Sequence, residues 1–154
     1  MTGSIEAKIE AMGIALPTAA APAANYVPFT RSGDLLFTAG QLPLRDGKLV
    51  STGPVGGGLD IAAGQEAARQ CAINILAQAR AALGSLDSVA RIVKTTVFVA
   101  SEPGFTQQHL VANGASDLLA EIFGEAGRHA RSAVGVASLP LDAPVEVEAV
   151  IECR

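Results

Sequence analysis

The 154-residue sequence has few aromatic and few charged residues. Tryptophan is absent, tyrosine occurs once, and charged residues make up only 17% of the chain, against about 25% in an average soluble domain. Hydrophobic residues nevertheless account for 49%, much of it alanine. A chain of this length buries a core without metal or disulfide staples. Because so few charges leave apolar surface uncovered, and burial between subunits is the usual remedy, the composition predicts a homo-oligomer.

Other absences exclude several classes of protein. A net charge of −4 and a pI near 5.1, with scattered Lys and Arg, argue against a nucleic-acid partner. No apolar run approaches the roughly 20 residues that a bilayer requires, and no signal peptide is recognisable at the N-terminus. Cys71 and Cys153 have no metal-ligand or redox spacing, and His109 and His129 have no companion ligands. We therefore expect a cytoplasmic protein without a metal, a cofactor or a membrane anchor.

Hydrophobic periodicity and turn residues predict an α+β fold. Asp60 and Gly84 are expected to cap the ends of a helix with a regular apolar stripe. Two long helices are predicted to pack on one face of a mixed sheet, in a single domain spanning 1–154 with a helical N-terminal extension over 1–20. The expected helices are 4–13, 61–83 and 105–124, and the expected strands are 27–31, 34–40, 48–50, 89–99, 132–137 and 145–152.

The candidates for chemistry in the C-terminal third are an arginine and the glutamates of the last strand. Arg131 begins a strand of small, apolar residues, where its guanidinium would reach solvent, form a salt bridge or bind an anion such as a substrate carboxylate. The alternating strand VEVEAVIE places Glu146, Glu148 and Glu152 on the face opposite Val145 and Val147. These glutamates form a solvated face, or one of them is partly desolvated, in which case its pKa is raised and it is suited to move a proton.

The segment RSAVGVASLPLDAPVEVEAVIE at 131–152 resembles the C-terminal signature of the RidA (YjgF) family of enamine/imine deaminases. The shared pattern is an arginine that opens a strand, a Leu-Pro eight residues later, and a closing Glu-aliphatic-Glu strand. LLFTAGQLP at 35–43, TTVFV at 95–99, Gln65 and Asn74 extend the resemblance, which covers roughly residues 20–154.

This resemblance implies a chorismate-mutase-like fold and a homotrimer with clefts between its subunits. It implies a cofactor-independent hydrolase that converts reactive 2-enamino or 2-imino acids to 2-keto acids and ammonia. In that assignment Arg131 binds the substrate carboxylate, Glu146 assists the attacking water, Gly40 offers a backbone contact, and Asn113 and Ala133 line the pocket. The alternatives are a non-catalytic trimer that binds a small carboxylate metabolite, and another hydrolase on the same scaffold, such as an endoribonuclease.

The sequence also departs from the family pattern. The Gly-Pro-Tyr before the first strand is absent, because the chain reads NYVP at 25–28, and alanines at 39 and 133 replace a serine and a cysteine. These changes make the expected cleft more apolar. A simple hairpin of the last two strands would separate Arg131 from Glu146 by roughly 17 Å. One cleft containing both residues therefore needs strands that are not neighbours, or two subunits, and the sequence leaves that choice open.

Overall fold

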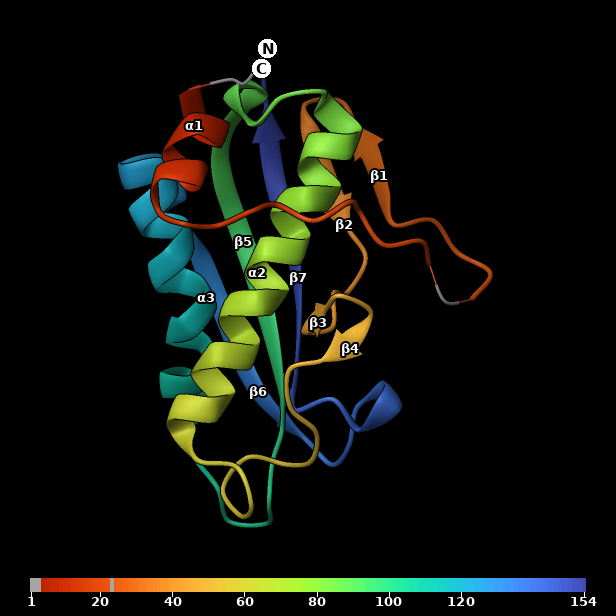
Figure 1. The fold of residues 1–154 in the computed structure, drawn as a ribbon, viewed down its shortest axis with the longest axis vertical. Coiled ribbons are helices and arrows are strands. Elements are labelled where there is room, and N and C mark those ends of the chain that lie inside the picture. The colour runs from red at the N-terminus through yellow and green to blue at the C-terminus, as the bar shows by residue number, and fades with distance from the viewer. Residues whose placement is uncertain (1–3, 23) are drawn as a thin grey trace.

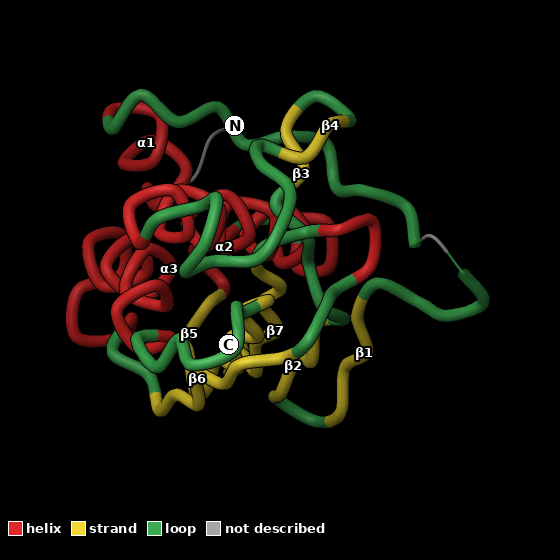
Figure 2. The backbone as a smooth tube through the Cα atoms, turned by 90° about the horizontal axis from the view of Figure 1, so that it is seen from below, coloured by secondary structure: helices red, strands yellow, loops and turns green. Residues whose placement is uncertain are grey.

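The computed structural model describes residues 4–22 and 24–154 and has three α-helices on one face of a five-stranded sheet (Figures 1 and 2). The helices are α1 (Ser4–Ala11), α2 (Ile61–Leu83) and α3 (Gln108–Phe123). The strands are β1 (Phe29–Ser32), β2 (Leu35–Thr38), β3 (Leu44–Arg45), β4 (Lys48–Leu49), β5 (Val89–Ala100), β6 (Ala130–Val136) and β7 (Val145–Cys153). This arrangement confirms the predicted α+β class with α2 and α3 packed on one face.

Helix α2 begins and ends where its capping residues predict. The Asp60 carboxylate accepts a hydrogen bond of 2.8 Å from the Ala63 amide, and Gly84, at a φ of 82°, donates its amide to the Arg80 carbonyl. Small residues then let the two long helices approach closely. A Cβ at Gly114 of α3 would overlap the backbone of Gln65 in α2, so the lack of a side chain at Gly114 permits the close contact of these two helices.

The main sheet has the strand order β1-β2-β7-β5-β6. Strands β5 and β6 run parallel and are joined through α3, while the other neighbouring pairs are antiparallel. The last two strands of the chain are therefore not neighbours, because β5 lies between them (Figure 1). One face of β7, formed by Val145, Val147, Ala149 and Ile151, is buried under the helices.

The structure corrects some of the predicted elements. The strand expected at 48–50 forms, but it pairs with Leu44–Arg45 in a separate two-stranded ribbon. Asp46 and Gly47, with φ values of 53° and 79°, make a tight two-residue turn that folds the chain back locally. Helix α3 begins at Gln108, later than predicted, because a turn closed by the Phe105 amide and the Glu102 carbonyl precedes it.

No described element covers the second face of the main sheet (Figure 2). This open face carries Phe37 and Val134, which are 40% and 43% exposed, together with the half-buried Phe98 and Val150. Exposed apolar side chains in this number on one sheet face indicate a surface that another molecule covers. Among the described helices, none has the length and apolar character needed to cross a membrane.

Candidate functional site

The Arg131 side chain is held against α3 by three hydrogen bonds. Its Nη1 donates to Asn113 Oδ1 at 2.9 Å and to Ser116 Oγ at 3.1 Å, and its Nη2 donates to the His109 carbonyl at 3.1 Å. Positions 109, 113 and 116 share one side of α3 because they are spaced by four and three residues. The helix therefore presents a row of acceptors that orients the guanidinium.

All three acceptors of Arg131 are neutral groups. The ion pairs in the described part of the chain are Arg45–Glu66 at 2.9 Å and Arg128–Glu125 at 3.6 Å, and neither includes Arg131. A guanidinium has five N–H donors, so three hydrogen bonds leave two, on Nε and Nη2, without a partner among the described residues. Two donors on neighbouring nitrogens match the geometry of a carboxylate. Of the alternatives for Arg131, this arrangement favours an anion site over a salt bridge.

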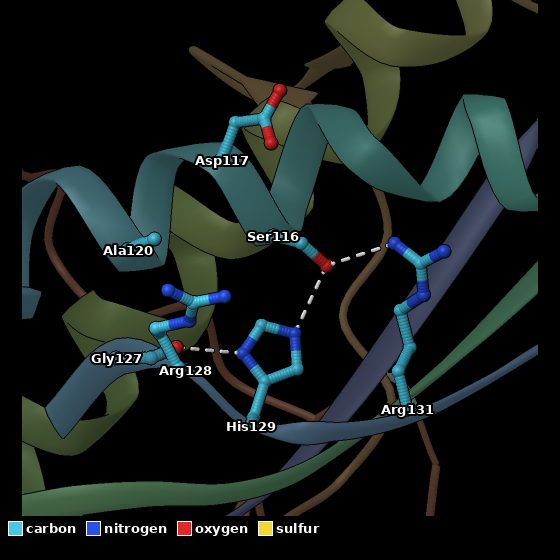
Figure 3. A pocket seen from close by; sticks show the side chains of 7 residues that line it. All are labelled: Ser116, Asp117, Ala120, Gly127, Arg128, His129 and Arg131. Atoms are coloured by element: carbon cyan, nitrogen blue, oxygen red, sulfur yellow. Dashed lines mark hydrogen bonds between the residues drawn. The ribbon is translucent and has the colours of Figure 1, made fainter. Parts of the chain in front are cut away.

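A cavity of about 310 Å³ adjoins this arginine (Figure 3). Ser116 lies between Arg131 and His129 in the cavity wall, and Ser116 Oγ is 2.9 Å from His129 Nε2. Sequence reasoning missed both residues as parts of a site, since no motif or spacing links them. The contact exists only because α3 crosses the start of β6. The cavity is lined by Ser116, Asp117, Ala120, Gly127, Arg128, His129 and Arg131.

Glu146 belongs to a second cluster, with Gly40. Its side chain lies on the open face of the sheet, where β7 places it opposite Phe98 of β5. Partial burial, followed by the nearby Glu148 carboxylate, raises the pKa of Glu146 above its ordinary value. A side chain at Gly40 would overlap the Glu146 carboxyl group. Glycine at position 40 therefore makes the space in which this carboxylate sits.

The two clusters lie on opposite faces of the sheet. Arg131 is opposite Thr95 and points toward the helices, as does Ala133, which packs against the core, whereas Glu146 points away from them. Strand spacing of about 4.8 Å and a rise of about 3.3 Å per residue put the Cα atoms of Arg131 and Glu146 roughly 14 Å apart. One chain thus brings Arg131, Asn113 and Ala133 together and keeps Gly40 and Glu146 apart from them.

Metal-binding clusters are absent from the described residues: no three His, Cys, Asp or Glu side chains converge there. Cys71 and Cys153 are both buried free thiols, so neither is offered to a ligand. Tyr26 is the single tyrosine of the chain, and it lies close in sequence to the family position before the first strand. It is 49% exposed. Among the described residues, it forms no hydrogen bond with the Arg131 or the Glu146 cluster.

Comparison with known protein families shows to which family the chain belongs. A family model described as "YjgF/chorismate mutase-like, putative endoribonuclease" matches residues 6–152. The chain belongs to the YjgF family. The resemblance seen in the C-terminal segment is thereby confirmed, and so is the chorismate-mutase-like fold.

Individual YjgF relatives extend the comparison over nearly the whole chain. Protein TCP17 of Trypanosoma cruzi is 53% identical over 98% of this chain and 95% of its own length. The solved structure of Atu1372 from Agrobacterium tumefaciens, described as having unknown function, is 54% identical with a TM-score of 0.92, covering 97% of this chain and 92% of that one. Escherichia coli TdcF, solved with bound serine, is 27% identical with a TM-score of 0.66, covering 89% and 94% of the two chains.

Proposed function

We propose that this protein hydrolyses 2-imino or 2-enamino acids to 2-keto acids and ammonia, in clefts between the subunits of a homotrimer. The observation that carries the proposal is Arg131: an oriented guanidinium with neutral partners and two unused donors. Such a group binds a ligand carboxylate through two charge-assisted hydrogen bonds, each contributing about 1.5–3 kcal/mol. The serine bound to TdcF, itself an amino acid with a carboxylate, is consistent with that ligand class.

Glu146 fits the role of the group that moves protons. Hydrolysis adds water across the C=N bond, and the resulting carbinolamine expels ammonia as the C=O bond forms. Water must lose a proton and the departing nitrogen must gain one. A partly desolvated carboxylate with a raised pKa accepts and returns a proton closer to neutral pH than an ordinary glutamate does. Glycine at position 40 makes the space that the Glu146 carboxyl group occupies.

The placement of the two clusters on opposite sheet faces supports a site made by two subunits. Within one chain the sheet itself separates Arg131 from Glu146. Strand β6 is an edge strand, so its outer hydrogen-bonding groups remain available to a neighbour. The exposed apolar side chains of the open face, Phe37 and Val134 among them, give such a neighbour a surface to bury. A cyclic trimer repeats this contact three times and closes on itself.

The decisive experiment measures ammonia release from 2-iminopropionate generated in situ by an amino-acid oxidase. We expect the protein to accelerate release, and Arg131→Ala to lower kcat/KM about 100-fold or more, because roughly 3 kcal/mol of carboxylate binding is lost. Arg69→Ala is the matched control and keeps wild-type activity, because it removes a half-buried guanidinium of α2 that makes no hydrogen bond among the described residues. Wild-type turnover in Arg131→Ala would refute the assigned role.

Mixed trimers test the shared site directly. Arg131→Ala and Glu146→Gln chains, each inactive alone, are unfolded together and refolded as a mixture. If each site takes Arg131 from one subunit and Glu146 from its neighbour, about a quarter of the sites in an equal mixture are intact, and activity returns to that level. Activity that stays at zero in well-folded mixed trimers would contradict the two-subunit site.

A carboxylate-binding protein without turnover is the second candidate, favoured by the replacement of a hydroxyl and a thiol with Ala39 and Ala133. It predicts saturable binding of pyruvate in calorimetry, abolished in Arg131→Ala, with no acceleration of imine hydrolysis. In that case Glu146→Gln would leave binding intact, whereas a deaminase loses its activity with the same change.

A further inference from the structure

A directional chain of polar groups runs from Arg131 across the cavity wall (Figure 3). Arg131 Nη1 donates to Ser116 Oγ at 3.1 Å, Ser116 Oγ lies 2.9 Å from His129 Nε2, and His129 Nδ1 lies 2.8 Å from the Gly127 carbonyl. Ser116 comes from α3, while His129 precedes Arg131 by two residues at the start of β6. Two elements far apart in the sequence therefore meet at one hydroxyl group.

The acceptors in this chain assign every proton. A carbonyl oxygen only accepts, so the hydrogen of the neutral His129 ring is on Nδ1 and is donated to Gly127. Nε2 then has a free lone pair, which accepts the Ser116 hydroxyl hydrogen. With its hydrogen directed to His129, Ser116 Oγ turns a lone pair toward Arg131 Nη1. Each group is donor to the next, from the guanidinium to the Gly127 carbonyl.

The surroundings of His129 favour the neutral ring that this arrangement needs. Burial lowers the pKa of His129, the hydrogen bond to the Gly127 carbonyl opposes that shift, and the Arg131 guanidinium adds to the lowering. Asp117 and Arg128 are the other charged side chains lining the same cavity. An imidazolium would convert Nε2 into a donor and remove the acceptor that orients the Ser116 hydroxyl.

We propose that Ser116 and His129 are positioning residues for Arg131, which fix the guanidinium so that its unused Nε and Nη2 donors face the ligand carboxylate. The proposal rests on the carboxylate-binding role given to Arg131 above. Asn113 and the His109 carbonyl hold two points of the guanidinium. Ser116 supplies a third, but only while His129 takes its hydroxyl hydrogen. Preorganisation of this kind strengthens binding by removing the need to order the side chain when the ligand arrives.

Matched variants separate positioning from general packing. Ser116→Ala removes the hydroxyl, and Ser116→Thr retains it. His129→Phe keeps a ring without the acceptor, while His129→Gln keeps an acceptor and a donor on one side chain. We expect Ser116→Ala and His129→Phe to raise KM for the imine, and the pyruvate Kd, about tenfold, with kcat changed less than threefold. Ser116→Thr and His129→Gln should restore most of the affinity. If all four variants keep the wild-type melting temperature and also bind the imine and pyruvate as tightly as the wild type, the proposal is overturned.

Nitrogen-15 NMR of the ligand-free protein tests the same chain without relying on turnover. We expect the His129 ring to show a protonated Nδ1 and an unprotonated Nε2 at pH 7, and the Arg131 Nη signals to be separate because rotation is hindered. Those signals should merge in Ser116→Ala and stay separate in Ser116→Thr. A proton on His129 Nε2, or Arg131 signals that stay separate in Ser116→Ala, would refute the proposed chain of hydrogen bonds. If the wild type neither turns over the imine nor binds pyruvate, the proposed function fails, and the NMR result still decides the positioning.

Discussion

Gly40 is the residue whose size most strictly limits the candidate site. Even a methyl group there would overlap the Glu146 carboxyl group. We predict that Gly40→Ala displaces the Glu146 side chain from its rotamer, lowers the free energy of unfolding by about 0.5–1.5 kcal/mol because the displaced atoms end a flexible side chain, and reduces the rate of imine hydrolysis. Chemical denaturation and the ammonia-release assay measure the two effects.

The matched control for Gly40→Ala is Gly58→Ala, because an added Cβ at Gly58 has no neighbour within 4 Å. A second substitution checks the cause: Glu146→Ala should remove most of the destabilisation caused by Gly40→Ala, since the overlapping group is then gone. Additive effects of the two changes would show that Gly40 acts through something other than Glu146.

Single residues differ in how far the sequence reveals their role. Arg131 is noticeable in the sequence because it begins a strand of small apolar residues, and the family resemblance, not the alternation of the last strand, singles out Glu146 among its glutamates. Ser116 and His129 have no such signal. A serine within a helix and a histidine before a strand are ordinary residues until the packing of α3 on β6 places them 2.9 Å apart.

At the level of elements, α1 is fastened to the rest of the molecule through its first turn. The Asp87 carboxylate accepts hydrogen bonds from the Ser4 amide, the Ser4 hydroxyl and the Ile5 amide, each at 2.9 Å. The Glu6 carboxylate also accepts a hydrogen bond from the Leu86 amide. Asp87 thus caps a helix that is more than 80 residues away in sequence.

We predict that Asp87→Asn loosens α1 and lowers stability in a pH-dependent way. These hydrogen bonds hold the pKa of Asp87 below its ordinary value of 3.8. A lowered native pKa means that the carboxylate stabilises the fold above pH 3.8, and that this stabilisation is lost as the pH falls through the native pKa. Wild type and Asp87→Asn should therefore differ at pH 7 and converge in strong acid.

Hydrogen exchange of the α1 amides at pH 7, with urea unfolding at a series of pH values from 7 down into strong acid, measures this difference. Asp117→Asn, at an exposed position of α3 with no hydrogen bond to its side chain among those described, is the control. A difference between wild type and Asp87→Asn that stays constant over the whole pH range would contradict the capping role.

Elements bounded by capping chemistry were predictable, and elements defined by their partners were not. Asp60 and Gly84 mark the ends of α2 in the sequence because caps are local interactions. The pairing of Lys48–Leu49 with Leu44–Arg45 depends instead on whether this strand binds its neighbour in sequence or an edge of the main sheet. The tight turn at Asp46–Gly47 brings Lys48–Leu49 back beside Leu44–Arg45. Hydrophobic periodicity predicts the strand but does not identify this partner.

For the whole molecule, the open face of the sheet is the surface on which we propose that assembly depends. We predict that Val134→Asp, which replaces an exposed apolar side chain of this face by a charge, dissociates the proposed trimer into monomers and abolishes imine hydrolysis while the far-UV circular dichroism is unchanged. Light scattering should give about three times the 15.6 kDa chain mass for the wild type.

Ala62→Asp provides the comparison for Val134→Asp. Ala62 is exposed in the first turn of α2, on the helical side of the molecule, where a carboxylate is tolerated. That variant should remain trimeric and active. A trimeric Val134→Asp protein would show that the subunits meet on another surface.

The placement of Arg131 and Glu146 on opposite sides of the sheet lies beyond the reach of sequence reasoning. Alternation along β7 assigns Glu146 to the face away from the core, and β6 by itself leaves the direction of Arg131 undetermined because its neighbours are small on both faces. Only the parallel register of β6 on β5, with Arg131 beside the buried Thr95, settles that direction.

The position of β7 between β2 and β5 also bears on how the chain folds. The strands of the β5-α3-β6 unit pair residues 36 positions apart, such as Lys94 with Ala130, whereas Leu36 of β2 pairs with Ile151, more than 100 residues away. The β1–β2 hairpin touches the sheet only along β7, so it has no place to dock until that strand is seated. Loop closure over such a distance slows the productive encounter. Refolding should therefore begin with the β5-α3-β6 unit and continue with β7. The β1–β2 hairpin, which leads into Gly40, should join the sheet last.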